Sequence, residues 1–175
     1  MSDTSSKHGV NENLAYSLDQ SLKLNLPKIY NGVDSFELRI WFWSLFRPKK
    51  LITLRFEMSH WQATETQYYE GQNQIDTSLT YKIEFKGDIQ DLVNRLSNDS
   101  ILQLPSQDAI PNFNDNVNDG QSFTIEIATN KFYKFLYYHC PEYFAKIEPN
   151  NRRFLNLILF INSYYSFYSP ICVVK

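Results

Sequence analysis

The fold is decided by residues 36–69, which with one flanking residue at each end read SFELRIWFWSLFRPKKLITLRFEMSHWQATETQYYE. Apolar and polar side chains alternate along residues 36–42 and again along residues 51–58, as they do in strands that bury one face. Residues 61–69 alternate less regularly but are rich in Thr, Tyr and Trp, which suit half-buried strands. The links between these segments are short, and one contains Pro48, so we expect an antiparallel meander rather than parallel strands joined by long crossovers.

The link between the second and third of these strands is expected to be a tight hairpin. Ser59 and His60 separate the two segments, although this dipeptide lacks the Asn-Gly pattern of two-residue turns. The strand before the loop should bury one apolar face, which consists of Ile52, Leu54, Phe56 and Met58.

Three further segments predict strands. Apolar and polar side chains alternate along residues 79–85 and 123–127, which indicates one buried face in each. Residues 132–139 carry aromatic side chains on both faces. We therefore expect this strand to be covered on both sides or to form an exposed aromatic surface.

Helical spacing is found in the remaining segments. Leu14, Leu18 and Leu22 recur every fourth residue, which predicts a short amphipathic helix with its leucines on one face. Asp88 is the expected N-cap of a second helix, and Pro149–Tyr165 is the expected span of the last one. The second helix has an i, i+3, i+4, i+7 apolar stripe, formed by Ile89, Leu92, Val93 and Leu96.

Together these elements predict an α+β fold. Four strands, a helix, two strands and a helix would give an antiparallel sheet of about six strands, with the Asp88 helix and the C-terminal helix packed on one face. The length of 175 residues fits one domain. We place that domain at residues 13–168, between a loose N-terminal segment at 1–12 and a tail at 169–175.

The charge and the cysteine content limit the classes to which this protein can belong. With 17 basic and 19 acidic residues the net charge is -2, which argues against nucleic-acid binding. Cys140 and Cys172 are too few for a disulfide scaffold or a zinc site. One bridge between them is an alternative, and two free thiols in a reducing compartment are the outcome that we expect.

The N-terminal segment lacks the charged, apolar and small-residue regions of a signal peptide. We therefore expect a cytoplasmic protein, or an exported one if a leader has been removed. No membrane span is expected, because Asn156, Asn162 and Ser163 interrupt the apolar run of the last helix.

The sequence holds no signature of catalysis. It has no phosphate loop, zincin helix, nucleophile elbow or paired-cysteine metal motif, so we expect no cofactor, no metal and no catalytic residue. His139 and Cys140 are adjacent, but neighbours in a strand point to opposite faces, which argues against a thiol–imidazole dyad.

A hydrolase built on carboxylates of the sheet is the least favoured alternative. Glutamates at positions 37, 57, 65, 84 and 126 could meet across the polar face. Carboxylates in such places usually pair with cations of neighbouring strands, here Arg39, Arg55 and Lys82.

The polar face of the first strand carries two tryptophans beside charged residues. Exposed tryptophans in such a setting anchor interfaces and stack on flat ligands. Residues 88–120 add an acidic bias, with six Asp and one Arg. The first functional hypothesis is therefore a non-enzymatic protein-interaction module, immunity- or inhibitor-like, acting through Trp41, Trp43, Arg39, Asp108 and Asp115.

Two alternatives stay open. The N-terminal helix or a loop could cover the tryptophans, and the aspartates could simply be solvated. The protein could instead bind a small apolar ligand in a pocket between the strand at 132–139 and the C-terminal helix.

Residues 30–165 resemble an uncharacterised family of small single-domain bacterial proteins. The resemblance is carried by FELRIW at residues 36–41, by Trp61 at the start of the third strand, and by CPEYF at residues 140–144. It implies an α+β domain of unknown function whose members often look exported. No activity and no site residue come with it.

Overall fold

The computed structural model describes residues 5–6, 9–43, 48–72, 74–84, 88–98, 101–114, 117 and 120–165. Six strands form the main sheet: β3 (Phe36–Trp43), β4 (Lys49–Glu57), β5 (His60–Glu70), β6 (Ile75–Lys82), β7 (Ser122–Thr129) and β8 (Tyr133–His139). Their order is β6-β5-β4-β3-β7-β8, and every neighbouring pair is antiparallel. The predicted meander is confirmed, because β3, β4, β5 and β6 pair in succession.

The helices of the described residues are α1 (Glu12–Lys23), α2 (Ile89–Asn98), α3 (Pro141–Phe144) and α4 (Pro149–Tyr165). The predicted cap of α2 is confirmed, since Asp88 Oδ1 accepts a 2.8 Å bond from the amide of Gln90. Two 3-10 turns, η1 (Ile101–Gln103) and η2 (Gln107–Ala109), lie in the segment after α2. Near the N-terminus, within the segment expected to be loose, β1 (Ser5–Ser6) pairs antiparallel with β2 (Gly9–Val10).

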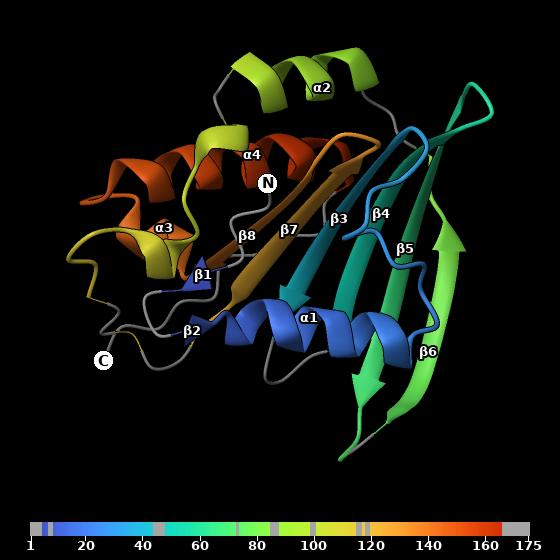
Figure 1. Ribbon diagram of the computed structural model, residues 1–175, viewed down its shortest axis with the longest axis horizontal. Helices are drawn as coiled ribbons and strands as arrows, with labels where there is room; N and C mark the ends of the chain where they lie inside the picture. Colours follow the sequence, from blue (N-terminus) through green and yellow to red (C-terminus); the bar gives the residue numbers. More distant parts are fainter. Residues whose placement is uncertain are drawn as a thin grey trace.

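One face of the sheet packs against α2 and α4, as predicted (Figure 1). Leu92 and Leu96 of α2 enter the same buried cluster as Phe154 and Ile158 of α4 and the aliphatic side chains of the strands. The ring of Tyr138 on β8 stacks on Phe154 at 4.1 Å between centroids. These side chains fill the space between β8 and α4, where we expected a ligand pocket.

The opposite face is covered by α1 and the segment that follows it (Figure 1). Trp41 and Leu51 of the sheet pack against Leu24 and Leu26, while Ile29 joins a cluster with strands β7 and β8. Strand β8 is therefore covered on both sides, which was one of the two outcomes expected for its aromatic residues.

Two expectations about burial are wrong. Strand β6 lies at the edge of the sheet, beyond the helices, and its apolar face is exposed: Leu79 is 56% and Tyr81 47% accessible. Met58 is 84% accessible because it belongs to the hairpin and not to β4. The hairpin loop is Met58–Ser59 rather than Ser59–His60, since Glu57 pairs with His60.

The expectation of free thiols is also wrong for one cysteine. Cys140 is disulfide-bonded and buried at the start of α3. The other cysteine of the sequence, Cys172, lies outside the described residues.

Candidate functional site

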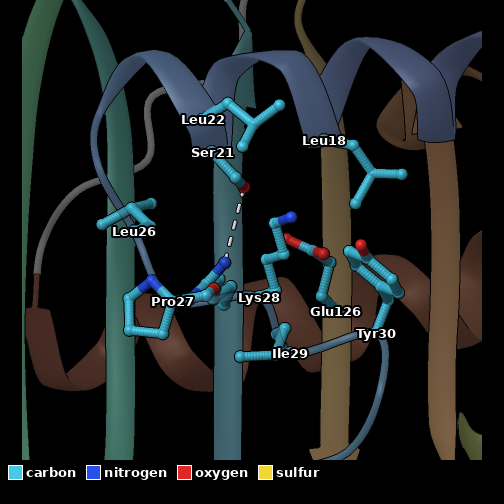
Figure 2. A pocket seen from close by; sticks show the side chains of 10 residues that line it. Leu18, Ser21, Leu22, Leu26, Pro27, Lys28, Ile29, Tyr30 and Glu126 are labelled. Carbon is cyan, nitrogen blue, oxygen red and sulfur yellow. Dashed lines mark hydrogen bonds between the residues drawn. The ribbon is translucent and has the colours of Figure 1, made fainter.

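A cavity of about 160 Å³ lies between α1 and the sheet. Figure 2 shows α1 crossing above it, with Leu18 and Leu22 pointing toward the segment that runs from Leu26 to Tyr30. The lining is mostly apolar but includes two charged side chains of the sheet. The residues that form it are Leu18, Ser21, Leu22, Leu26, Pro27, Lys28, Ile29, Tyr30, Arg39 and Glu126.

Helix α1 lies on the sheet with its polar side inward. Ser17, Gln20 and Ser21 are buried, whereas Leu22 is 59% accessible and Leu18 is half-buried. The predicted leucine stripe is therefore real but does not enter the main core. Leu14 packs against the cluster around Ile29, whereas Leu18 and Leu22 form one wall of the cavity. The polar side of α1 faces inward because the sheet beneath it presents charged groups that need polar partners.

Arg39 on β3 is the centre of that charged layer. Its Nε donates a 2.8 Å bond to Glu37, and its terminal nitrogens donate to the Pro27 carbonyl at 2.7 Å and to Ser21 Oγ at 3.4 Å. Arg55 Nε donates to the other Glu37 oxygen at 2.7 Å. The Arg39 and Glu37 side chains are almost fully buried, so this network depends on its internal partners.

Glu126 on β7 is buried beside Arg39. Its two carboxyl oxygens accept bonds from Trp41 Nε1 at 2.6 Å and from the Tyr133 hydroxyl at 2.7 Å. Burial raises the pKa of Glu126, and it outweighs the opposite effects of Arg39 and of the two hydrogen bonds. The pKa of Tyr133 is also raised, first by burial and then by Glu126. A carboxyl group that resists ionisation therefore stands at the edge of an apolar cavity.

The predicted site residues do not form an exposed surface. Trp41 and Arg39 are buried beneath α1 and its following segment, so the alternative in which these elements cover them is confirmed. Trp43 is half-buried: its Nε1 donates to Thr124 Oγ1 at 2.9 Å, and its ring stacks on Trp41 at 5.1 Å.

The acidic part of that predicted surface is separate. Asp108 lies in η2 and is half-buried, and no contact described for it joins it to Trp41 or Trp43. Asp115 lies outside the described residues. The tryptophans and the aspartates are thus not brought together in the described part of the chain.

Among the described residues, no group of three His, Cys, Asp or Glu side chains is placed to hold a metal ion. Of the five glutamates that we expected on the sheet, Glu37 pairs with Arg39 and Arg55, as predicted, and Glu65 pairs with Lys50. His139 contacts Ser122 Oγ through Nδ1 at 2.8 Å and the carbonyl of Val117, which precedes β7, through Nε2 at 3.2 Å.

Several residues of the cavity were not singled out from the sequence. Ile29 and Tyr30 lie in a segment without periodicity, so no pattern marks them. Glu126 alternates like any strand glutamate, and only the β3–β7 pairing, which places it opposite Arg39 and within hydrogen-bonding distance of Trp41, shows that it is buried. The spacing of the leucines predicted an amphipathic helix but did not show that two of them, Leu18 and Leu22, line a cavity.

No protein-family model matches the chain, and no curated protein matches it either. Its resemblance to an uncharacterised bacterial family stays a prediction.

Proposed function

We propose that this protein is a non-enzymatic binding protein that takes up a small apolar group in the cavity beneath α1. The observation that carries the proposal is the orientation of this helix. It buries Ser17, Gln20 and Ser21 but leaves Leu18 and Leu22 to line an open cavity. Leaving leucines at a cavity rather than in the core forgoes burial free energy, which a bound apolar group would restore.

The size of the cavity sets the size of the ligand. An engineered apolar cavity of about 150 Å³ stays dry and binds benzene. A cavity of about 160 Å³ therefore accommodates one aromatic ring or a branched aliphatic group of similar volume. Larger ligands would extend past Leu22 and Tyr30, which are both exposed at the cavity.

The test is binding of toluene, a neutral ring without polar groups, measured by ligand-observed NMR and by the shift in thermal unfolding temperature. Leu18→Trp places a larger side chain in the cavity and should abolish both signals. Leu159→Trp is the matched control, because Leu159 is exposed on α4, on the other side of the sheet. Equal toluene signals from the wild type and Leu18→Trp, or none from the wild type, would refute the proposal.

A protein partner is the second candidate function, and the edge strand β6 favours it. An unpaired edge can accept a strand from another chain, and native proteins usually protect such edges. Here Leu79 and Tyr81 are exposed on β6, next to the exposed Tyr69 of β5. The double variant Leu79→Lys/Tyr81→Lys should lose a partner that the wild type and Leu159→Lys both retain in affinity purification. A partner recovered equally by all three proteins would exclude this edge.

The compartment is part of the proposal. Among the described residues, no helix is long and apolar enough to cross a membrane. The disulfide at Cys140 favours an oxidising compartment over the cytoplasm that we expected from the N-terminal segment. Mass spectrometry after alkylation, with and without prior reduction, would report whether Cys140 is bonded in protein taken from its own cells.

A further inference from the structure

We propose that the ligand is a small aromatic or branched aliphatic carboxylate, with its apolar part beneath α1 and its carboxylate against Arg39. This inference rests on the proposed function, and it names the chemical class that the cavity selects. Three features of the cavity support it: the unused donors of Arg39, the balance of charge, and the state of Glu126.

The guanidinium group of Arg39 carries N–H donors that its described hydrogen bonds do not use. An arginine side chain carries five N–H groups, one on Nε and two on each terminal nitrogen. The described bonds to Glu37, Pro27 and Ser21 use one on each nitrogen. One N–H on each terminal nitrogen therefore has no acceptor among these partners. Arg39 lines the cavity, and two such donors match the two oxygens of a carboxylate.

The charges around the cavity favour an anion. Arg39 and Lys28 line it, against the single carboxyl group of Glu126. Behind Arg39, Glu37 is shared with Arg55, so three cationic side chains face two carboxyl groups. Lys28 is exposed and forms no ion pair within the described part of the chain. A bound carboxylate would offset this excess of positive charge.

Glu126 is arranged to tolerate a neighbouring anion. Arg39, Trp41 and Glu37 face it from β3, Tyr133 faces it from β8, and Lys28 lines the same cavity. Burial already favours its neutral form, and a bound carboxylate would favour that form further by like-charge repulsion. This preference for the neutral form reduces the repulsion between Glu126 and a bound carboxylate.

The experiment compares ligands that share a ring and differ in the polar group: benzoate, benzyl alcohol, benzylamine and toluene. Dissociation constants are measured at pH 7 by ligand-observed NMR and isothermal calorimetry. Benzoate should bind at least about tenfold more tightly than benzyl alcohol, and benzylamine should bind most weakly.

Three variants assign the preference to the side chains. Lys28→Met, at an exposed position, should weaken benzoate binding by roughly two- to fivefold and leave toluene unchanged. Lys146→Met is the matched control, because Lys146 is also exposed but does not line the cavity. Glu126→Gln removes the carboxyl group that would repel the ligand, and it should bind benzoate at least as tightly as the wild type.

The outcomes separate this inference from the proposed function. If toluene binds but benzoate binds no more tightly than benzyl alcohol, the carboxylate preference is refuted and the apolar site stands. If benzylamine binds best and Glu126→Gln abolishes its binding, Glu126 and not Arg39 selects the ligand, which also refutes the inference. If none of the four binds, both proposals fall together.

Discussion

The indole Nε1 of Trp41 donates a 2.6 Å hydrogen bond to Oε2 of Glu126, joining two residues 85 positions apart at a place that solvent does not reach. The bond follows from the β3–β7 pairing, which sets Arg39 opposite Glu126 and places Trp41 two positions further along β3, on the same face and opposite Thr124. It gives a buried carboxyl group one of its two donors, and Tyr133 supplies the other. The polar side chains beneath α1 are therefore held by specific hydrogen bonds, and single substitutions can test each of these bonds.

Glu126→Gln should change how stability depends on pH. The pKa of Glu126 is raised in the folded protein above its ordinary value of 4.5, chiefly by burial. Below about pH 4.5 both states carry the proton, and as pH rises the unfolded state loses it first. The wild type should therefore lose unfolding free energy relative to Glu126→Gln as pH rises above 4.5.

Chemical denaturation at several values between pH 4.5 and 8 would measure this difference. The substitution should also lower the unfolding free energy by an amount that does not change with pH, because one oxygen acceptor is replaced by an amide nitrogen. Only the pH-dependent part reports the buried carboxyl group. If the difference between the two proteins is flat over this range, Glu126 does not titrate differently in the folded and unfolded states.

Trp41→Phe should destabilise the fold by about 1–3 kcal/mol, the usual cost of leaving a buried acceptor without its donor. The variant removes the Nε1–H that Glu126 accepts and reduces the stacking on Trp43. Trp61→Phe is the control, since Trp61 is half-buried and its described contacts are with the rings of Phe36 and Phe56. A smaller loss for Trp41→Phe than for Trp61→Phe would contradict this reading of the network.

Glu70→Gln should remove a stabilising contribution that is lost in acid. Partial burial raises the pKa of Glu70, but hydrogen bonds from Lys49, Tyr16 and Gln20 outweigh it and lower the pKa to about 2. This contribution is complete above pH 4.5 and is lost as pH falls toward about 2. The wild type should therefore approach the stability of Glu70→Gln as pH falls through that range.

Acid titration of unfolding, followed by circular dichroism in denaturant, would show the convergence. Glu84→Gln is the control, because it removes an exposed carboxylate after β6 that does not belong to the contacts of Glu70. Parallel curves of unfolding free energy against pH for the wild type and Glu70→Gln between pH 2 and 4.5 would contradict this prediction. They would show that the contacts of Glu70 with Lys49, Tyr16 and Gln20 do not stabilise the fold through its charge.

Much of the fold could be read from local pattern. The span of α4 and the cap of α2 are set by proline and aspartate chemistry within a few residues, so the sequence is sufficient to place them. The strands follow from alternation for the same reason. Alternation also separates the two faces of β3, with Leu38 and Ile40 on one and Arg39 and Trp41 on the other.

The candidate site could not be read in that way, because it depends on which elements cover which face. From the sequence, the charged face of β3 is expected to be exposed to solvent. Arg39 is buried because α1 and the segment around Pro27 pack over this face and accept its hydrogen bonds. The opposite error occurs on β6. Leu79 and Tyr81 alternate like core residues, but their strand is the edge of the sheet, where no helix of the described chain covers them.

Replacing Met58–Ser59 by Asn-Gly should stabilise the protein by about 1 kcal/mol. Both residues have positive φ, 50° and 65°, in a two-residue loop between β4 and β5, which is the backbone of a type I′ turn. Left-handed backbone costs roughly 1–2 kcal/mol per ordinary residue, whereas Gly and Asn adopt it readily. Because Met58 is largely exposed to solvent, the change removes no packing contacts of the core.

Ser78→Gly, at an exposed strand position without positive φ, is the control and should instead lower stability by roughly 0.5–1 kcal/mol. A loss of thermal stability in the Asn-Gly variant would show that the left-handed turn is not the conformation of this hairpin in solution.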